Sequence, residues 1–297
     1  AEQHPRAAEL TALAQMLAEM LGGRFGFLGQ AANSVGGYLA NCLPAAKGLN
    51  ASAMLASPRK AYVLVGLEPE LDCHNPAQAA SAMAAADFVV ALTSYRGRIA
   101  DYADVMLPLA PFSEISGTFV NCEGRAQSFN AVAKPVGEAR AGWKIFRVLG
   151  NILGLAGFEQ DCSEAVRAEA LGESGDPASK LDNRTEGIKL SLDKPARGGI
   201  QRLADVPIYF SDPIVRRATA LQQTPDAQPP KAQMNAAMAG QFGLAEGDRI
   251  KLTQDGEATL EVALVEGLPA GVVRVAAAHP STAALGAMFG EIALEKI

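Results

Sequence analysis

The sequence predicts an α/β fold in which a doubly wound, mostly parallel sheet is followed by a small C-terminal β-barrel. Continuous apolar runs alternate with a helical segment between residues 61 and 109, a pattern typical of parallel strands covered on both faces. Short strands separated by tight turns occupy residues 249–275, which favours a barrel. Of the 297 residues, 49 % are hydrophobic and 20 % are charged, so the chain can bury a large core.

The first element is a predicted amphipathic helix over residues 8–21, because its leucines and methionines recur on one helical face. They are Leu10, Leu13, Met16, Leu17, Met20 and Leu21. A glycine pair stops the helix, and residues 24–28, Arg-Phe-Gly-Phe-Leu, are predicted as a short buried strand. We assign residues 1–22 to a helix at the end of a preceding domain, and the initial Ala1 indicates an excised fragment or a processed chain.

The α/β domain is predicted over residues 23–158, and its clearest part is a strand, helix, strand unit. Residues 61–65 and 87–92 are apolar runs, and the helix between them, 76–86, begins with a proline in an early helical position. A helical turn then leads into a third strand over residues 104–109. This order of elements predicts a parallel sheet covered on both faces.

Two further elements are predicted at the end of the α/β domain. Residues 116–129, Ser-Gly-Thr-Phe-Val-Asn-Cys-Glu-Gly-Arg-Ala-Gln-Ser-Phe, resemble two short strands around a polar turn. Glu114, Glu123 and Arg125 could form a charge-assisted pair that rigidifies this hairpin. Apolar residues from Trp143 to Leu153 then have helical spacing.

The C-terminal half is predicted to contain a long connection and then the barrel. Residues 159–230 form the connection, which is rich in charged residues, Gly and Ser and is expected to be partly irregular. Residues 231–297 form the barrel domain, with strands at 249–253, 258–265 and 272–275. An Asp-Gly pair between the first two of these strands is a hairpin signal.

Charge and motif content exclude several functions. The formal net charge is −6 and the cations do not cluster, so nucleic acid is not an expected partner. The apolar stretches fall short of the ~20 residues that a membrane span requires, so no direct span is expected. Neither phosphate-binding glycine motifs nor zinc-protease or serine-hydrolase motifs occur. The four cysteines lie far apart in the chain, which argues against a local iron–sulfur or zinc site: Cys42, Cys73, Cys122 and Cys162.

Polar residues follow the first two predicted strands of the sheet, at the edge where α/β proteins bind ligands. The first strand is followed by three acids, which disfavour a bare anion, and the second by hydroxyls and an arginine, which favour one. These residues are Glu68, Glu70 and Asp72, and Thr93, Ser94, Tyr95 and Arg96. The alternative is that they only cap the loops and hold no ligand.

A longer pattern resembles a known family. Residues 100–129, "ADYADVMLPLAPFSEISGTFVNCEGRAQSF", are similar to a signature of the molybdopterin oxidoreductase superfamily. More narrowly, "AANSVGGYLANCLP", "GLEPELD" and the sequence through "GWKIFRVLGNILGL" resemble the large iron–sulfur subunit of bacterial NADH-quinone oxidoreductase, respiratory complex I. The resemblance spans roughly residues 25–157, and the tail from residue 231 resembles the family's double-psi-like barrel.

The resemblance implies an electron-transfer subunit that contacts other subunits of the peripheral arm, at the cytoplasmic face of the bacterial inner membrane. In such subunits, cysteine groups of the N-terminal part hold the iron–sulfur clusters. This chain has no such groups, so we expect no cofactor, no metal and no catalytic residue in this fragment. It would be a structural part that supports the cluster-bearing half.

Catalytic members of the superfamily bind a molybdenum or tungsten pterin between the α/β domain and the barrel. The resemblance places Thr93, Ser94, Asn121 and Arg125 near that crevice. In the complex I branch it implies a relic crevice without the cofactor. The alternative is a fragment of a molybdopterin-dependent oxidoreductase such as a formate dehydrogenase, and a third reading is a free-standing ligand-binding α/β protein.

Overall fold

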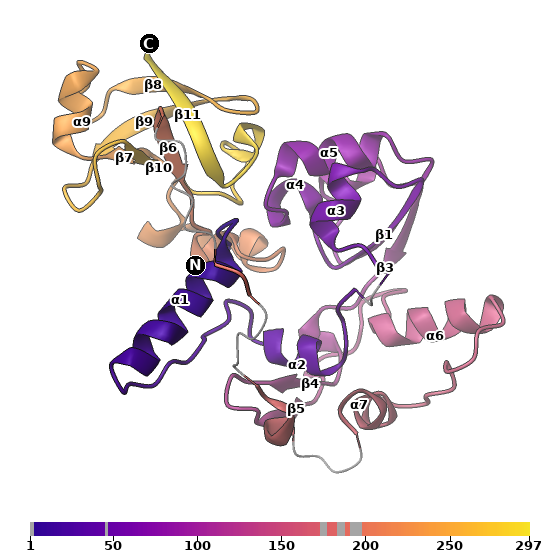
Figure 1. Cartoon of the computed structure of the whole chain (residues 1–297). Helices are drawn as coiled ribbons and strands as arrows, with labels where there is room; N and C mark the ends of the chain where they lie inside the picture. The colour runs from indigo at the N-terminus through magenta and orange to yellow at the C-terminus, as the bar shows by residue number, and fades with distance from the viewer. Residues whose placement is uncertain (1–2, 45–46, 173–176, 183–187, 191–197) are drawn as a thin grey trace.

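The computed structural model describes residues 3–44, 47–172, 177–182, 188–190 and 198–297. Figure 1 shows the barrel as one body and the α/β elements as another, with α1 projecting beside them. The helices are α1 (Ala7–Met20), α2 (Ser34–Leu39), α3 (Ala51–Ala56), α4 (Pro69–Asp72), α5 (Pro76–Ala84), α6 (Gly142–Ile152), α7 (Ser163–Leu171), α8 (Thr219–Gln222) and α9 (Ala236–Gln241). The strands are β1 (Ala61–Val65), β2 (Phe88–Thr93), β3 (Val105–Pro108), β4 (Gly117–Val120), β5 (Ala126–Phe129), β6 (Ile200–Leu203), β7 (Ala232–Met234), β8 (Arg249–Thr253), β9 (Glu257–Leu264), β10 (Val272–Arg274) and β11 (Phe289–Lys296).

The α/β domain contains the predicted parallel sheet, in the order β1-β2-β3. Ala61 of β1 pairs with Phe88 of β2, and Val90 of β2 pairs with Val105 of β3. The side chain of Asn75 caps α5 by accepting a hydrogen bond of 3.0 Å from the backbone N–H of Gln78. The proline that follows Asn75 fits because the first helical position needs no N–H partner.

The two connections between these strands lie on one face of the sheet. The connection from β1 to β2 contains α5, and the connection from β2 to β3 contains a short 3₁₀ helix, Arg98–Asp101. Both connections pack into the same core on one face, together with α3. The opposite face therefore leaves Val63 54 % exposed and Phe88 46 % exposed.

The predicted small double-psi-like barrel is confirmed as a closed ring in the order β10-β6-β11-β8-β9-β7. Two pairs, β6 with β10 and β7 with β9, are parallel, and the other pairs are antiparallel. A continuous apolar core fills the ring, and its fully buried members include Met234, Ile250, Leu252, Val262, Val273, Leu285 and Ile292.

The barrel also takes a strand from the predicted connection over residues 159–230. Strand β6 points the buried Arg202 inward and leaves Leu203 39 % exposed, so its sequence lacks the apolar alternation of an ordinary barrel strand. A boundary at residue 231 therefore does not separate all barrel strands from the connection. Residues 173–176, 183–187 and 191–197 of that connection lie outside the described residues.

The first helix and the polar hairpin are present, but the strand predicted over residues 24–28 is not. That segment has no regular secondary structure and exposes 81 % of Leu28. Strands β4 and β5 form the hairpin, and the side chain of Asn33 accepts a hydrogen bond of 2.8 Å from the backbone of Val120. Within the described part of the chain, no helix combines the length and apolarity needed to cross a membrane.

Candidate functional site

The candidate site begins where β1 ends, at the carboxyl edge of the parallel sheet. The chain leaves β1 through Gly66, which has a φ of +64°, and continues into α4 through Glu68. The backbone N–H of Glu68 donates a hydrogen bond of 2.6 Å to Oδ2 of Asp72. This local turn presents the carboxylates of both residues on the same side of the strand end.

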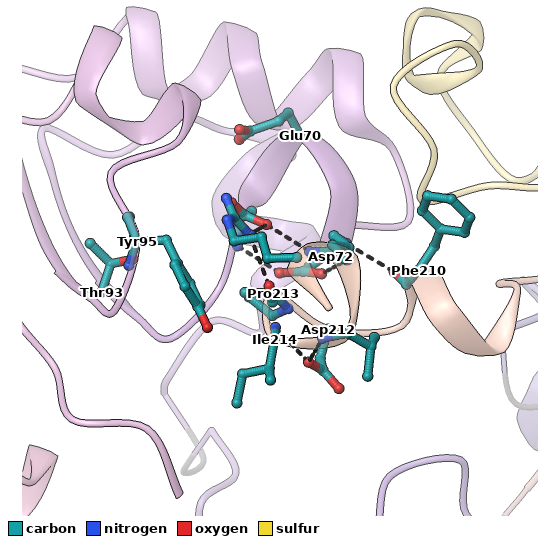
Figure 2. A network of polar contacts seen from close by, with 12 residues as sticks. Glu70, Asp72, Thr93, Tyr95, Phe210, Asp212, Pro213 and Ile214 are labelled. Atoms are coloured by element: carbon teal, nitrogen blue, oxygen red, sulfur yellow. Dashed lines mark hydrogen bonds and ion pairs between the residues drawn. The ribbon is translucent and has the colours of Figure 1, made fainter. Parts of the chain in front are cut away.

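Two consecutive arginines from the connection bind these carboxylates, and we call the four side chains the arginine clamp (Figure 2). Nη1 of Arg216 donates to Oε2 of Glu68 at 2.9 Å, and its Nη2 donates to Asp72. Arg217 also binds Glu68, with its Nη1 at 3.2 Å from Oε2 and its Nη2 on Oε1. The clamp therefore joins parts of the chain that lie almost 150 residues apart.

The backbone around residues 210–217 fixes the direction of both guanidinium groups. Oδ1 of Asp212 accepts hydrogen bonds from the backbone of Ile214 at 2.7 Å and of Val215 at 3.0 Å, which closes the turn before the arginines. Nε of Arg216 donates to the carbonyl of Phe210 at 2.9 Å. Nη1 of Arg217 donates to the carbonyl of residue 213 at 3.0 Å. Backbone carbonyls of the loop that contains the two arginines therefore also fix the orientation of their guanidinium groups.

The clamp is enclosed on its other side by the loop after β2. The guanidinium of Arg217 lies over the ring of Tyr95, 4.4 Å from its centroid, which adds a cation–π contact. Gly97 has a φ of +44°, and a Cβ there would lie 2.9 Å from Oε1 of Glu68. The chain can therefore pass this close to the clamp only with glycine at that position. Glu70 is not part of the clamp and instead accepts a hydrogen bond of 3.1 Å from the Tyr102 hydroxyl.

Two side chains of the clamp are buried, the other two are partly exposed, and the charges of the four are matched. The side chains of Glu68 and Arg216 are 6 % and 7 % exposed. Burial acts to raise the pKa of Glu68, but hydrogen bonds from Arg217 and Arg216 outweigh it and hold that pKa below its ordinary value. The hydrogen bond to Glu68 in turn raises the pKa of Arg217. Two guanidinium groups and two carboxylates leave the network without net charge.

This pKa shift predicts an acid-sensitive contribution to stability. A carboxylate whose folded pKa is lowered stabilises the folded state fully above its unfolded pKa, and the contribution is lost as pH falls through the folded pKa. We therefore expect the free energy of unfolding to decline on acidification below about pH 4.5, the ordinary value for Glu68. Urea denaturation across this range should show a shallower decline in Glu68→Gln, which cannot titrate. Equal pH slopes in the two proteins would contradict the assignment.

A cavity of about 740 Å³ lies beside the clamp. The loop after β1, the connection, the barrel and the N-terminal loops all contribute to its wall, which includes Asp72, Cys73, Asp212, Arg216 and Met288. Burial, followed by the nearby charges of Asp72 and Glu70, raises the pKa of the Cys73 thiol to about 11. Because the thiolate is the nucleophilic form, this cysteine is not activated for catalysis.

The charges around the cavity do not suit a polyanion. Among the described residues of its wall, Arg216 is the one cation, and its guanidinium is already bound to two carboxylates and a carbonyl. Asp72 and Asp212 add negative charge to the same wall. In the parts of the chain that the structure describes, no group of three histidine, cysteine or acidic side chains could hold a metal ion.

None of the four residues that the sequence placed near a crevice lines this cavity. Thr93 ends β2 and Ser94 follows it, and their side chains donate hydrogen bonds to the carbonyls of Tyr95 at 2.8 Å and Leu109 at 2.7 Å. Asn121 and Arg125 belong to the separate β4–β5 hairpin. The side chains of Thr93, Ser94 and Asn121 therefore form hydrogen bonds within their own loops and turns.

The predicted ion pair within the hairpin is also wrong. Among described residues, the Arg125 guanidinium forms no ion pair with Glu114 or Glu123. Glu114 instead accepts a hydrogen bond of 3.2 Å from the backbone of Val136. The side chain of Asn121 closes the turn by accepting hydrogen bonds from the backbone N–H groups of Glu123 at 3.0 Å and Arg125 at 2.9 Å. Amide capping, rather than charge pairing, shapes this hairpin.

Sequence reasoning missed the arginines of the clamp altogether. They lie in the connection, in the stretch Asp-Pro-Ile-Val-Arg-Arg over residues 212–217. The available signal was an Asp-Pro turn followed by adjacent arginines, in a chain that also has three acids directly after a strand. It could have suggested complementary charges, although not which acids are bound.

Comparisons with known proteins place the chain among oxidoreductases. A family model described as "Molybdopterin oxidoreductase" matches residues 1–152. The "Probable oxidoreductase YjgC" of Bacillus subtilis (strain 168) is 33 % identical over 153 residues, which are 52 % of this chain and 15 % of that protein. A protein of Staphylococcus aureus (strain bovine RF122 / ET3-1) with a provisional formate dehydrogenase name is 43 % identical over 68 residues, which are 23 % of this chain and 7 % of that protein.

A solved structure shares the fold over most of the chain. Acetylene hydratase from Pelobacter acetylenicus aligns with a TM-score of 0.58 at 17 % identity, covering 80 % of this chain and 41 % of that one. This chain thus spans less than half of that protein and a still smaller share of the two sequence relatives.

Proposed function

The chain belongs to the molybdopterin oxidoreductase family, and we propose that it is a structural, cofactor-free portion of an electron-transfer subunit in such an oxidoreductase. The subunit we favour is the large iron–sulfur subunit of NADH-quinone oxidoreductase, respiratory complex I. In this proposal the chain supports the half of the subunit that carries the clusters. It would contact other subunits of the peripheral arm, at the cytoplasmic face of the inner membrane.

The arginine clamp is the observation that carries this proposal. A molybdenum or tungsten pterin carries phosphate, so its site needs cations or N–H donors that are not already committed. Among its described wall residues, the cavity beside β1 has Arg216 as its one cation, and that side chain is bound to Glu68 and Asp72. The remaining charged side chains of its wall repel phosphate. The described residues therefore do not fit the pterin, and we derive no chemical step through it.

The second candidate is a portion of a molybdopterin-dependent oxidoreductase such as a formate dehydrogenase. The provisional name of the Staphylococcus aureus relative favours this candidate, and it does so more directly than any comparison favours complex I. That similarity covers 68 residues. Under this candidate, the clamp would have to open so that Arg216 or Arg217 could bind phosphate.

Metal analysis of the natively assembled protein separates the two candidates. We expect iron but no stoichiometric molybdenum or tungsten, because the clusters would be held elsewhere in the subunit and the cavity does not suit a pterin. Inductively coupled plasma mass spectrometry of the purified assembly would measure all three metals. One molybdenum or tungsten per chain would overturn the first proposal and support the second.

A further inference from the structure

Residues 24–28, Arg-Phe-Gly-Phe-Leu, have the composition of a strand but no strand partner. None of their backbone N–H or C=O groups hydrogen-bonds to another described residue. Phe27 is 41 % exposed and Leu28 is 81 % exposed. An extended apolar segment with unpaired backbone groups can add to the edge of a β-sheet.

The helix before this segment has an apolar face that the described residues cover only in part. Within the described structure, its large apolar side chains are exposed by between 40 % and 79 %: Leu10, Leu13, Met16, Leu17, Met20 and Leu21. Ala12 is the one buried residue of α1. In Figure 1, α1 extends away from the other elements. A helix with one apolar stripe is normally stabilised by packing that stripe against a sheet or another helix.

The turn between the helix and the segment already has the geometry of a helix-to-strand connection. Gly22 has a φ of +62°, its N–H donates to the carbonyl of Glu19 at 3.1 Å, and the N–H of Gly23 donates to the carbonyl of Ala18 at 2.8 Å. This pair of bonds is a Schellman motif, which ends a helix and redirects the chain. Three residues, 21–23, then separate α1 from the segment, a length common between helices and strands.

We propose that residues 7–28 dock as one unit on the free edge of an α/β sheet that lies outside these 297 residues. In the docked state, residues 24–28 pair as an added strand, and α1 covers the face of the same sheet. The unpaired backbone groups require a sheet edge as their partner. The apolar stripe of α1 requires an apolar sheet face next to that edge. This surface is separate from the arginine clamp, so the inference does not depend on the proposed function.

A partner sheet fits this unit better than a second copy of the chain. Two copies could pair only through two short strands, and an isolated two-stranded ribbon is at best marginally stable in water. Such a ribbon would also leave most of the α1 stripe uncovered. In an extended segment, Phe25 and Phe27 lie on one face and Arg24, Gly26 and Leu28 on the other, so an added strand could bury the phenylalanine face.

Hydrogen exchange measured by mass spectrometry tests the proposal. The natively assembled protein, isolated from its own cells through an affinity tag, is compared with the isolated 297-residue chain. We expect the amides of residues 25–28 to exchange about 100-fold more slowly in the assembly, because strand pairing would protect them. The isolated chain is expected to be monomeric, with rapid exchange at these amides.

A matched pair of substitutions identifies the added strand. Phe27→Pro removes one N–H, so it should abolish the protection of residues 25–28 in the assembly. Phe27→Leu keeps the N–H and an apolar side chain, so it should retain the protection. Since the backbone of Phe27 forms no hydrogen bond with a described residue, neither substitution should change the melting temperature of the isolated chain.

Three outcomes would overturn the proposal. Rapid exchange of residues 25–28 in both samples would show that the segment does not pair. Protection in the isolated chain, as monomer or dimer, would show that its partner is the chain itself or a second copy. Protection that survives Phe27→Pro in the assembly would show that burial, rather than strand addition, slows the exchange.

Discussion

Replacing Arg216 with alanine is expected to lower the free energy of unfolding of the 297-residue chain by about 3 kcal/mol. The substitution leaves the buried carboxylate of Glu68 with less positive charge and removes the guanidinium bound to Asp72, and the cost of the buried charge of Glu68 dominates the effect. We place the value at the low end of the usual range because Arg217 still binds Glu68. Urea denaturation followed by circular dichroism measures the change.

Two further variants make this result specific to the clamp. Arg125→Ala removes the same side chain from an exposed hairpin position without an ion pair to a described residue, so it should change stability by less than about 0.5 kcal/mol. Asp72→Asn in the Arg216→Ala background should recover part of the loss, because it removes an unpaired carboxylate. If Arg216→Ala and Arg125→Ala had equal effects, the clamp would not stabilise the fold.

Truncating Leu252 in the barrel is expected to cost about 2–5 kcal/mol. This side chain on β8 is fully buried in the barrel core. Leu252→Ala removes its contacts and leaves a cavity that the closed ring of strands can fill only in part. Thermal or urea unfolding would measure the loss, and tryptophan fluorescence of Trp143 in α6 would show whether the α/β domain unfolds in the same transition.

The control for this variant is the same substitution at the barrel surface. Leu264 lies on β9 and is 37 % exposed, so Leu264→Ala removes less buried area and should cost clearly less than Leu252→Ala. Similar losses for both variants would argue against the barrel core as described.

Local sequence patterns were sufficient to predict most of the regular elements. The strands β1 and β2 and the helix α5 between them follow from apolar runs and a proline at the first helical position. The hairpin and the barrel strands β8 and β9 follow from turn residues and alternation. Each of these signals lies within about ten residues, the scale over which strand and helix periodicity acts.

Local patterns failed to predict the structure of residues whose conformation depends on contacts with residues far away in the sequence. Strand β6 was missed because its inward residue, Arg202, is charged and donates to the carbonyl of Ala287 at 2.9 Å inside the barrel. Residues 24–28 have a strand's composition, but no described residue pairs with them. The relic crevice candidates were placed by resemblance, and three of their side chains, those of Thr93, Ser94 and Asn121, form hydrogen bonds within loops and turns.

The sequence by itself determined the α/β and barrel classes and the membership of a molybdopterin oxidoreductase family, since both depend on local composition and on a long contiguous signature. Only the tertiary structure decided that the acids after β1 bind Arg216 and Arg217. Glu68 and Arg216 are separated by 148 residues, and no periodicity links positions so far apart. Their pairing depends on how the folded chain returns to the edge of the sheet, where burial makes the match of charges necessary.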